Sequence, residues 1–343
     1  MNAKDPGFPV ALAAREFDVL RVLTYHRVSE LKDTLWLDPR LISATPVAFA
    51  RQMRYLAEHY HVVSMAEVLN AVENGTRLPR RAVLLTFDDA YRDFGEIAWP
   101  ILKKYRLPVM LFVPTAYPDH PERAFWWDRL YRAIAYTSHT DLRETPLGPL
   151  ALGTSDQRKD SLYKVQSYAK TIPHARAMAF VDEVCTRLGY KQFEQETVLG
   201  WEKLRSLMKE GVALAAHTRT HPIMTQLSPE QVREEITGSL QDLRREIGSV
   251  LPVFSYPGGK HDDTVVRILK EEGFVMAFTT FGRNKLNSEN LLRLGRTNIT
   301  RRTSFPIFCL RLLPLVTYFD LWRRQRQHRS PMLTKPASIQ YPA

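Results

Sequence analysis

Residues 84–91 read Leu-Leu-Thr-Phe-Asp-Asp-Ala-Tyr, so an apolar run passes directly into two adjacent carboxylates. The run begins at Ala82, and 82–87 is predicted to be a strand that is buried on both faces. Because unpaired carboxylates are costly to bury, we expect Asp88 and Asp89 at the strand end, where the chain can turn and bring both into one site. One carboxylate could then bind a cation while the other takes up a proton; alternatively, the pair caps a helix.

Short apolar runs alternate with helical patterns on both sides of this strand, which predicts an α/β fold of parallel strands joined by helices. The other predicted strands are 20–25, 62–63, 109–113, 212–216, 253–256, 275–279 and 294–299. Helices are expected to begin after Ser64, Ser228 and Asp262, because Glu67 and Gln231 complete capping boxes for the first two.

The chain is predicted to divide into four parts along its length. Residues 1–17 form an N-terminal extension, and 18–300 form the main domain. Within that domain, 118–200 breaks the strand–helix rhythm and is expected to be a mostly helical insertion on a loop that follows a strand. Residues 301–329 are a basic, apolar C-terminal segment, and 330–343 are expected to be a disordered tail.

The composition is that of an ordinary globular protein, with 343 residues, 44% hydrophobic residues and 25% charged residues. The two cysteines, Cys185 and Cys309, are expected to be free thiols rather than a disulfide. No stretch is long and apolar enough to predict a membrane span, and the first residues lack a clear export signal. A cytoplasmic location is therefore expected.

The net charge of +11 is concentrated late in the chain, since residues 301–329 contain seven arginines and one acid. Apolar and aromatic residues separate these arginines, a combination that fits peripheral contact with anionic lipid at the inner face of a membrane. The alternative is a C-terminal helix that covers the main domain. Nucleic acid is not expected as a partner, because no recognised binding module accompanies the charge.

A second polar segment, residues 216–222, reads Ala-His-Thr-Arg-Thr-His-Pro and follows the predicted strand 212–216. Pro222 biases His221 away from helical dihedral angles, so His217 and His221 are expected on a loop. Two imidazoles and a carboxylate suit a catalytic metal site that keeps positions open for water. The alternative is a pair of surface histidines.

A third segment, residues 254–259, reads Phe-Ser-Tyr-Pro-Gly-Gly and ends another predicted strand. Glycine lets a backbone N–H approach a ligand closely, and such a group can stabilise an oxyanion. The alternative is a plain turn. Residues 125–128, Phe-Trp-Trp-Asp, open the insertion, and the rings of Trp126 and Trp127 are expected either to stack on a sugar or to pack internally.

Thr-Phe-Asp-Asp, His-Thr-x-x-His-Pro and Tyr-Pro-Gly occur in this order, each after a predicted strand. In these motifs the chain resembles the polysaccharide deacetylase family, also called the NodB-homology or carbohydrate esterase family 4 domain. The resemblance covers about residues 18–300 and implies a distorted (β/α)7 barrel that binds one divalent metal, usually zinc. It also implies that Asp88 is the catalytic base and that Asp89, His217 and His221 are the metal ligands.

The chain departs from the family pattern at two places. Many relatives carry Arg-Pro-Pro-Tyr at the third segment, where the arginine braces the base; here Ser255 and Gly258 occupy the arginine and aromatic positions, and Arg293 or Arg296 is expected to replace the brace. The late Leu-x-x-His acid motif is also missing. Residues 24–26, Thr-Tyr-His, instead resemble the poly-N-acetylglucosamine deacetylase branch, in which an early Tyr-His supplies the acid, so His26 is expected to be either the general acid or a structural histidine.

The resemblance implies a hydrolase of carbon–nitrogen bonds other than peptide bonds, active in cell-envelope biosynthesis. It would release acetate from an N-acetylated amino sugar that is polymeric, lipid-linked or nucleotide-linked. The Gly258 amide is expected to stabilise the oxyanion, and the expected substrate contacts are Tyr91, Tyr256, Pro257, Trp126 and Trp127. The alternatives are a non-catalytic carbohydrate-binding protein on the same barrel and a deacylase of a non-sugar amide.

Overall fold

The structure is a computed structural model that describes residues 20–192, 194–280, 286 and 291–313. Its main sheet contains all of the predicted strands, and every neighbouring pair in it is parallel. In chain order the strands are β1 Arg21–Tyr25, β4 His61–Val62, β5 Ala82–Asp88, β6 Met110–Val113, β9 Ala213–Ala216, β10 Val253–Ser255, β11 Met276–Thr279, β12 Leu294–Gly295 and β13 Thr297–Asn298.

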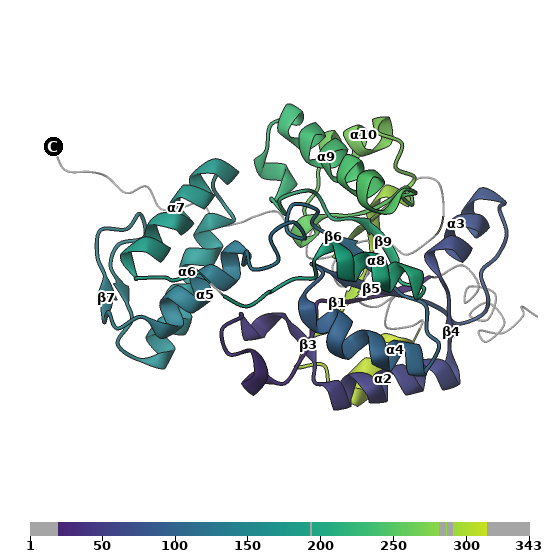
Figure 1. The fold of residues 1–343 in the computed structure, drawn as a ribbon, viewed down its shortest axis with the longest axis horizontal. Coiled ribbons are helices and arrows are strands. Elements are labelled where there is room, and N and C mark those ends of the chain that lie inside the picture. Colours follow the sequence, from purple (N-terminus) through teal and green to yellow (C-terminus); the bar gives the residue numbers. More distant parts are fainter. Residues whose placement is uncertain (1–19, 193, 281–285, 287–290, 314–343) are drawn as a thin grey trace, which may run out of the picture.

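The strand order shows how the sheet curls into a nearly closed barrel (Figure 1). The order is β12-β11-β10-β9-β6-β5-β1-β13, and β4 pairs with β5 outside this path. The first and last strands of the path are two halves of residues 294–298, interrupted only at Arg296. Counted as one broken strand, they leave seven strand positions around the barrel, which confirms the predicted distorted (β/α)7 architecture.

Parallel pairing places the candidate site residues at one edge of the barrel. The register aligns Tyr25 with Phe87, and Asp88 with Phe112. It also aligns Val113 with Ala216, directly before His217. The carboxyl ends of parallel strands share one face of such a barrel, and loops at that face commonly carry the chemistry.

Helices cover the outside of the barrel, with α9 and α10 on one side of the strands and α2 and α4 on the other (Figure 1). The capping boxes predicted at Ser64 and Ser228 are present, and Asp262 accepts a hydrogen bond from the Val265 backbone N–H. The helices of the barrel are α2 Pro46–His59, α3 Met65–Glu73, the π-helix Phe94–Ala98, α4 Trp99–Lys104, α8 Trp201–Lys209, α9 Pro229–Ile247 and α10 Asp263–Glu271.

Strands β1, β5, β6, β10 and β11 are buried on both faces, as their continuous apolar character predicts. Leu84 belongs to a cluster of buried side chains with Met110 and Phe278, whereas Leu85 belongs to the cluster that contacts the covering helices. Neither leucine is exposed. A rigid barrel wall of this kind can hold the residues at its strand ends in fixed positions.

A second group of helices lies beside the barrel, between β6 and α8 in the sequence (Figure 1). It comprises α5 Trp126–Tyr136, α6 Ser155–Ala169 and α7 His174–Arg187, with a hairpin of β7 Asp141–Leu142 and β8 Leu150–Ala151. These elements bury their own cluster of apolar side chains, including Leu130, Val165 and Val181. We call residues 126–187 the helical insertion.

A parallel pair outside the barrel, β2 Arg27–Val28 and β3 Ile42–Ala44, was not predicted from the sequence. It holds a loop with two short 3-10 turns, Leu31–Thr34 and Pro39–Leu41. The cysteines are free, as expected. The N-terminal extension, residues 314–329 and the tail lie outside the described residues, and within the described part no helix is long and apolar enough to cross a membrane.

Candidate metal centre and active site

The two carboxylates reach one site because the chain turns sharply after β5. Asp88 is the last residue of that strand, and Asp89 and Ala90 follow with φ values of +73° and +52°. Left-handed backbone at consecutive non-glycine residues is strained, and such strain clusters at functional sites. The expected arrangement of Asp88 and Asp89 at a strand end is therefore present.

The two histidines lie on the loop that follows β9. Thr218 and His221 also have left-handed φ values, +64° and +61°, and the Thr218 hydroxyl accepts a hydrogen bond from the His221 N–H at 3.0 Å. Glu235 of α9 accepts from the backbone N–H groups of Arg219 and Thr220 at 2.7 and 2.8 Å. These contacts hold the loop in a shape in which the Nε2 atoms of both histidines lie near Asp89.

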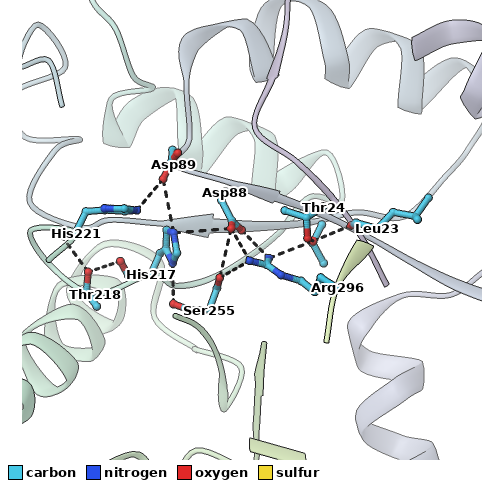
Figure 2. Close-up of polar contacts among 10 residues, drawn as sticks. Leu23, Thr24, Asp88, Asp89, His217, Thr218, His221, Ser255 and Arg296 are labelled. Atoms are coloured by element: carbon cyan, nitrogen blue, oxygen red, sulfur yellow. Dashed lines mark hydrogen bonds and ion pairs between the residues drawn. The ribbon is translucent and has the colours of Figure 1, made fainter. Parts of the chain in front are cut away.

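Asp89, His217 and His221 form a group that could hold a cation (Figure 2). One ligand atom from each residue lies within 4.8 Å of the others, and Asp89 Oδ1 is 3.2 Å from His221 Nε2 and 3.6 Å from His217 Nε2. Asp89 Oδ1 is nevertheless buried without a hydrogen bond among the described residues. A divalent cation between the three side chains would satisfy this oxygen, so the residues fit the metal that the motifs imply.

The orientation of His217 suits this role. Its Nδ1 lies 2.7 Å from the carbonyl oxygen of Ser255, which requires a proton on Nδ1 and leaves Nε2 free to bind a cation. Burial lowers the pKa of His217 to about 4, so the ring is neutral at neutral pH. Burial opposes ionisation of Asp89, but the neighbouring histidines outweigh it and lower the pKa of Asp89 below its ordinary value.

Asp88 is held by Arg296 through two hydrogen bonds (Figure 2). Arg296 Nη1 donates to Asp88 Oδ1 at 2.8 Å, and Nη2 donates to Oδ2 at 2.6 Å. Ser255 and Thr86 accept further hydrogen bonds from the same guanidinium at 2.9 and 3.3 Å. Burial alone would raise the pKa of Asp88, but Arg296 and His217 hold it well below its ordinary value, so Asp88 stays ionised.

Arg296 lies where the barrel closes, between β12 and β13. The single strand predicted at 294–299 is interrupted there, where its pairing changes from β11 to β1, and the Arg296 side chain reaches Asp88. Arg293, the other arginine considered from the sequence, instead pairs with Asp263 at 2.5 Å on the surface. The brace that the third motif lacks is thus supplied by Arg296.

A cavity of about 540 Å³ opens over these groups, a size typical of ligand sites. His26 and Gly258 both line it, together with Asp88, Asp89 and the two histidines. Gly258 lies in the 3-10 turn Pro257–Gly259 with φ +60°. His26 is fixed at its backbone, where its N–H donates to the Ser43 hydroxyl at 2.9 Å.

The expected substrate contacts divide into two groups. Trp126, Trp127 and Tyr256 line the cavity, although the Tyr256 hydroxyl is occupied by a hydrogen bond to the Leu292 carbonyl oxygen at 2.8 Å. Pro257 is buried and Tyr91 is fully buried, and neither is among the cavity residues. The geometry therefore does not support the expected contacts of Tyr91 and Pro257 with substrate.

Tyr91 instead joins the barrel to the helical insertion. Its hydroxyl donates to Asp128 Oδ2 at 2.6 Å and accepts from Trp127 Nε1 at 2.8 Å. The Trp127 ring packs edge-on against His221, with 4.8 Å between ring centroids. Tyr91 and Asp128 thus hold a cavity wall that contacts a candidate metal ligand.

Comparisons with known proteins agree with the motifs and the fold. A family model described as polysaccharide deacetylase matches residues 154–277. Over these residues the chain is similar to polysaccharide deacetylases. It is 35% identical over 85 residues to the poly-beta-1,6-N-acetyl-D-glucosamine N-deacetylase of Escherichia coli, which covers 24% of this chain and 13% of that protein. The enzyme of the same name from Staphylococcus aureus is 30% identical over 125 residues, 34% of this chain and 42% of that protein.

Solved structures of other deacetylases share the fold. The Streptococcus pyogenes deacetylase PplD superposes with a TM-score of 0.58 at 21% identity, covering 87% of this chain and all of that chain. IcaB from Ammonifex degensii gives 0.56 at 19% identity, covering 87% and 98%. The chain spans less than half the length of these two curated relatives.

Several residues around the cavity were not predicted from the sequence to belong to the site. Asp38 and Arg40 lie on the unpredicted β2–β3 loop, and Lys170 lies at the end of α6. Lys260 directly follows the Pro-Gly-Gly turn, so proximity to that motif was the one signal that could have identified it. Asp128 ends the quoted Phe-Trp-Trp-Asp motif, but its complete burial could not be predicted from that motif.

Proposed function

We propose that this chain hydrolyses the N-acetyl amide of an acetylated amino sugar and releases acetate. The observation that carries the proposal is the convergence of three strand ends on one cavity. There, three potential ligand atoms lie within 4.8 Å of one another, and Asp88 Oδ2 lies 3.9 Å from His217 Nε2. The names of the curated relatives support an N-acetylated sugar as substrate.

Asp89, His217 and His221 would hold the metal, and two imidazoles with one carboxylate favour zinc. When bound, the metal would polarise the acetyl carbonyl and ease the ionisation of a water molecule. Asp88 lies beside this group and stays ionised because Arg296 compensates its charge. Its carboxylate can therefore accept the proton of the attacking water.

Two further groups complete the proposed reaction. The Gly258 N–H would donate to the oxygen that becomes negative as the tetrahedral intermediate forms. His26, which directly follows the neighbouring strand β1, would donate a proton to the nitrogen of the departing amine. Trp126 and Trp127 would offer ring faces or edges to the sugar.

The experiment is an acetate-release assay on N-acetylhexosamine conjugates, on their O-acetylated counterparts and on simple N-acetyl amides without a sugar. We expect activity on the N-acetyl sugars to disappear after exhaustive chelation and to return when zinc is added. Activity that survives full metal removal would contradict the proposed mechanism. Turnover of the simple amides alone would favour the non-sugar deacylase, and metal-independent sugar binding without turnover would favour a binding protein.

We also propose that the C-terminal segment contacts an anionic membrane surface. Helix α11, Phe305–Arg311, is followed by two more described residues, and its inner face buries Phe308 and Leu312 against the barrel. Its outer face exposes Ile307, Leu310 and Leu313 by 42%, 50% and 46%. Both sequence interpretations therefore have support, one on each face of the helix.

Charge favours anionic lipid as the occupant of the outer face, because Arg301 and Arg302 are exposed just before α11. We expect the full chain to sediment with vesicles that contain phosphatidylserine or phosphatidylglycerol and not with neutral vesicles. Replacing Ile307 and Leu310 by Ser should weaken this binding, whereas Val47→Ser, at another exposed apolar residue, should not. Equal binding to neutral vesicles would contradict the proposal.

A further inference from the structure

Three cationic side chains surround the outer part of the cavity. Arg40 comes from the β2–β3 loop, Lys170 from the end of α6 in the helical insertion, and Lys260 from the residue after the Pro-Gly-Gly turn. All three residues are exposed, and all three line the same cavity as the candidate metal ligands. We call Arg40, Lys170 and Lys260 the cationic rim.

The carboxylates of the cavity do not neutralise this rim. Among the described residues that line the cavity, the acidic ones are Asp38, Asp88 and Asp89. Asp88 is engaged by Arg296, and Asp89 belongs to the candidate metal centre. Only Asp38 remains, and it pairs with Arg40, so neither Lys170 nor Lys260 has a carboxylate partner in the described structure.

The rim is partly preorganised. Arg40 donates from Nε to both oxygens of Asp38, at 3.0 and 3.1 Å, and from Nη2 to Gln166 of α6. This arrangement fixes the guanidinium between the barrel loop and the insertion and leaves Nη1 without an acceptor among the described residues. Lys170 Nζ lies 5.9 Å from the Trp126 ring, beside a surface on which a sugar could stack.

The three cations are close enough to influence one another. Although Lys170 is exposed as a residue, partial desolvation of its ammonium group by the surrounding chain lowers its pKa; the positive charges of Arg40 and Lys260 lower it further, while Asp38 acts in the opposite direction. Like charges held together without a counter-charge are unfavourable, and the repulsion would be relieved by an anion bound between them.

We propose that the cationic rim binds a phosphate or diphosphate group of the substrate, so that the N-acetylated sugar is presented as a phosphate conjugate. This inference rests on the proposed deacetylation and specifies its substrate class. Three positive charges face one carboxylate at the rim, and a phosphate group with a charge of about −1.5 to −2 matches that excess. A single carboxylate on the substrate, as in a uronic acid, would match only about half of it.

The chemistry of the side chains also favours phosphate. Lysine ammonium groups bind phosphate oxygens as point charges, and an arginine with a free guanidinium nitrogen can donate to a further oxygen. The phosphate could come from a soluble nucleoside diphosphate sugar or from a sugar carried on a polyprenyl diphosphate. In both sources the phosphate is joined to the anomeric carbon C1. In a 2-acetamido sugar the acetamido nitrogen is on the adjacent carbon C2, so one cavity can hold both groups.

The first experiment compares kcat/KM for acetate release by the zinc-loaded full chain. The substrates are N-acetylglucosamine 1-phosphate, its nucleoside diphosphate conjugate, its polyprenyl diphosphate conjugate and neutral N-acetylglucosamine oligomers. We expect at least one phosphate conjugate to exceed the neutral oligomers by about 25-fold or more, and the preferred conjugate identifies the source of the phosphate. Each of Lys170→Gln and Lys260→Gln should reduce this preference about fivefold, and the double variant about 25-fold.

Matched variants separate charge from folding. Lys164→Gln removes the same charge from an exposed position on α6 that does not line the cavity, and it should leave the preference unchanged. Lys170→Arg and Lys260→Arg keep the charge and should retain most of the preference. Raising the salt concentration should weaken the preference of the wild-type chain, because the rim is exposed.

A binding measurement distinguishes failure of this inference from failure of the proposed function. Glucose 1-phosphate and methyl glucoside contain no amide, so calorimetry with the zinc-loaded chain reports binding without turnover. We expect the phosphate to bind at least about tenfold more tightly, and the lysine variants to lose that difference. If the difference persists in the double lysine variant, the phosphate binds the metal rather than the rim, and the proposal is wrong.

The proposal is also wrong if neutral oligomers are processed as well as every phosphate conjugate and the lysine variants behave like the wild type. If no acetate is released from any substrate but the lysine-dependent phosphate binding is observed, the proposed deacetylation fails while the anion site stands.

Discussion

The inner end of the cavity and its cationic rim compensate charge in different ways. At the inner end, Asp88 and Arg296 are only 3% and 6% exposed, and two hydrogen bonds join them. At the rim, Lys170 and Lys260 are exposed and have no carboxylate partner among the described residues. The inner end is supplied by strand ends of the barrel, whereas the rim combines the helical insertion with two loops.

This difference assigns catalysis to the inner end and substrate selection to the rim. Buried, mutually compensated groups hold a fixed geometry, which is what proton transfer and metal binding require. Exposed, uncompensated cations contribute little to stability and are available to a ligand. Changes at the inner end should therefore lower the rate for every substrate, whereas changes at the rim should alter the ranking of substrates.

At the inner end, the substitution Asp88→Asn should have the largest effect on activity. The amide cannot accept the proton of the attacking water, so kcat should fall by about 10³-fold for all substrates alike. Zinc content, measured by mass spectrometry, should be retained because Asp88 is not among the three candidate ligands. Full activity in this variant would remove Asp88 from the role of base, and loss of zinc would show that it helps to bind the metal.

The next largest effect is expected for Arg296→Lys, which keeps the charge but loses the bidentate hydrogen bonding to Asp88. We expect kcat to fall by about 10²-fold. Because Arg296 lowers the pKa of Asp88, the variant should have a higher Asp88 pKa, and the acidic limb of its pH–rate profile should move to higher pH. Arg293→Lys, at an exposed pair with Asp263, is the control and should leave both quantities unchanged.

The same contrast explains which parts of the molecule could be predicted from sequence. Asp88 and His217 lie more than 100 residues apart, yet both follow continuous apolar strands, and the shared edge of a parallel barrel brings such positions together. Arg40 and Lys170 carry no comparable signal, because they meet only through the packing of a loop against the insertion. Tyr91, which was expected to contact substrate, is fully buried: the motif shows that it follows the carboxylates, but not that its hydroxyl donates to Asp128 in the interior.

Tyr91→Phe tests whether the wall between the two regions is structural. The variant removes the hydroxyl that pairs with Asp128 and Trp127, leaving two polar groups unsatisfied. We expect the free energy of unfolding in urea to fall by about 1–3 kcal/mol, with KM changed by no more than about twofold. A large rise in KM without loss of stability would restore Tyr91 as a substrate contact.

Asp128 provides the smallest and most specific test, because it belongs to the same wall and accepts a hydrogen bond from the backbone N–H of Asp38, the partner of Arg40 in the rim. Burial raises its pKa to about 7, although Tyr91 and Arg27 act against the rise. Between pH 4 and pH 7 the unfolded chain therefore releases the Asp128 proton while the folded chain retains it. Stability should accordingly fall as pH rises through this window, by up to about 1.4 kcal/mol per pH unit from this group.

Asp128→Asn removes this titration while keeping the shape of the side chain. The free energy of unfolding of the wild type minus that of the variant should therefore decrease from pH 5 to pH 7 and then level off. Asp182→Asn, at an exposed ion pair on α7, is the matched control and should show no such trend. A difference that stays constant across the window would mean that Asp128 is ionised in the folded protein. Its carboxylate would then have to be stabilised by Arg27, whose buried Nη1 and Nη2 atoms have no hydrogen-bond partner, rather than by a retained proton.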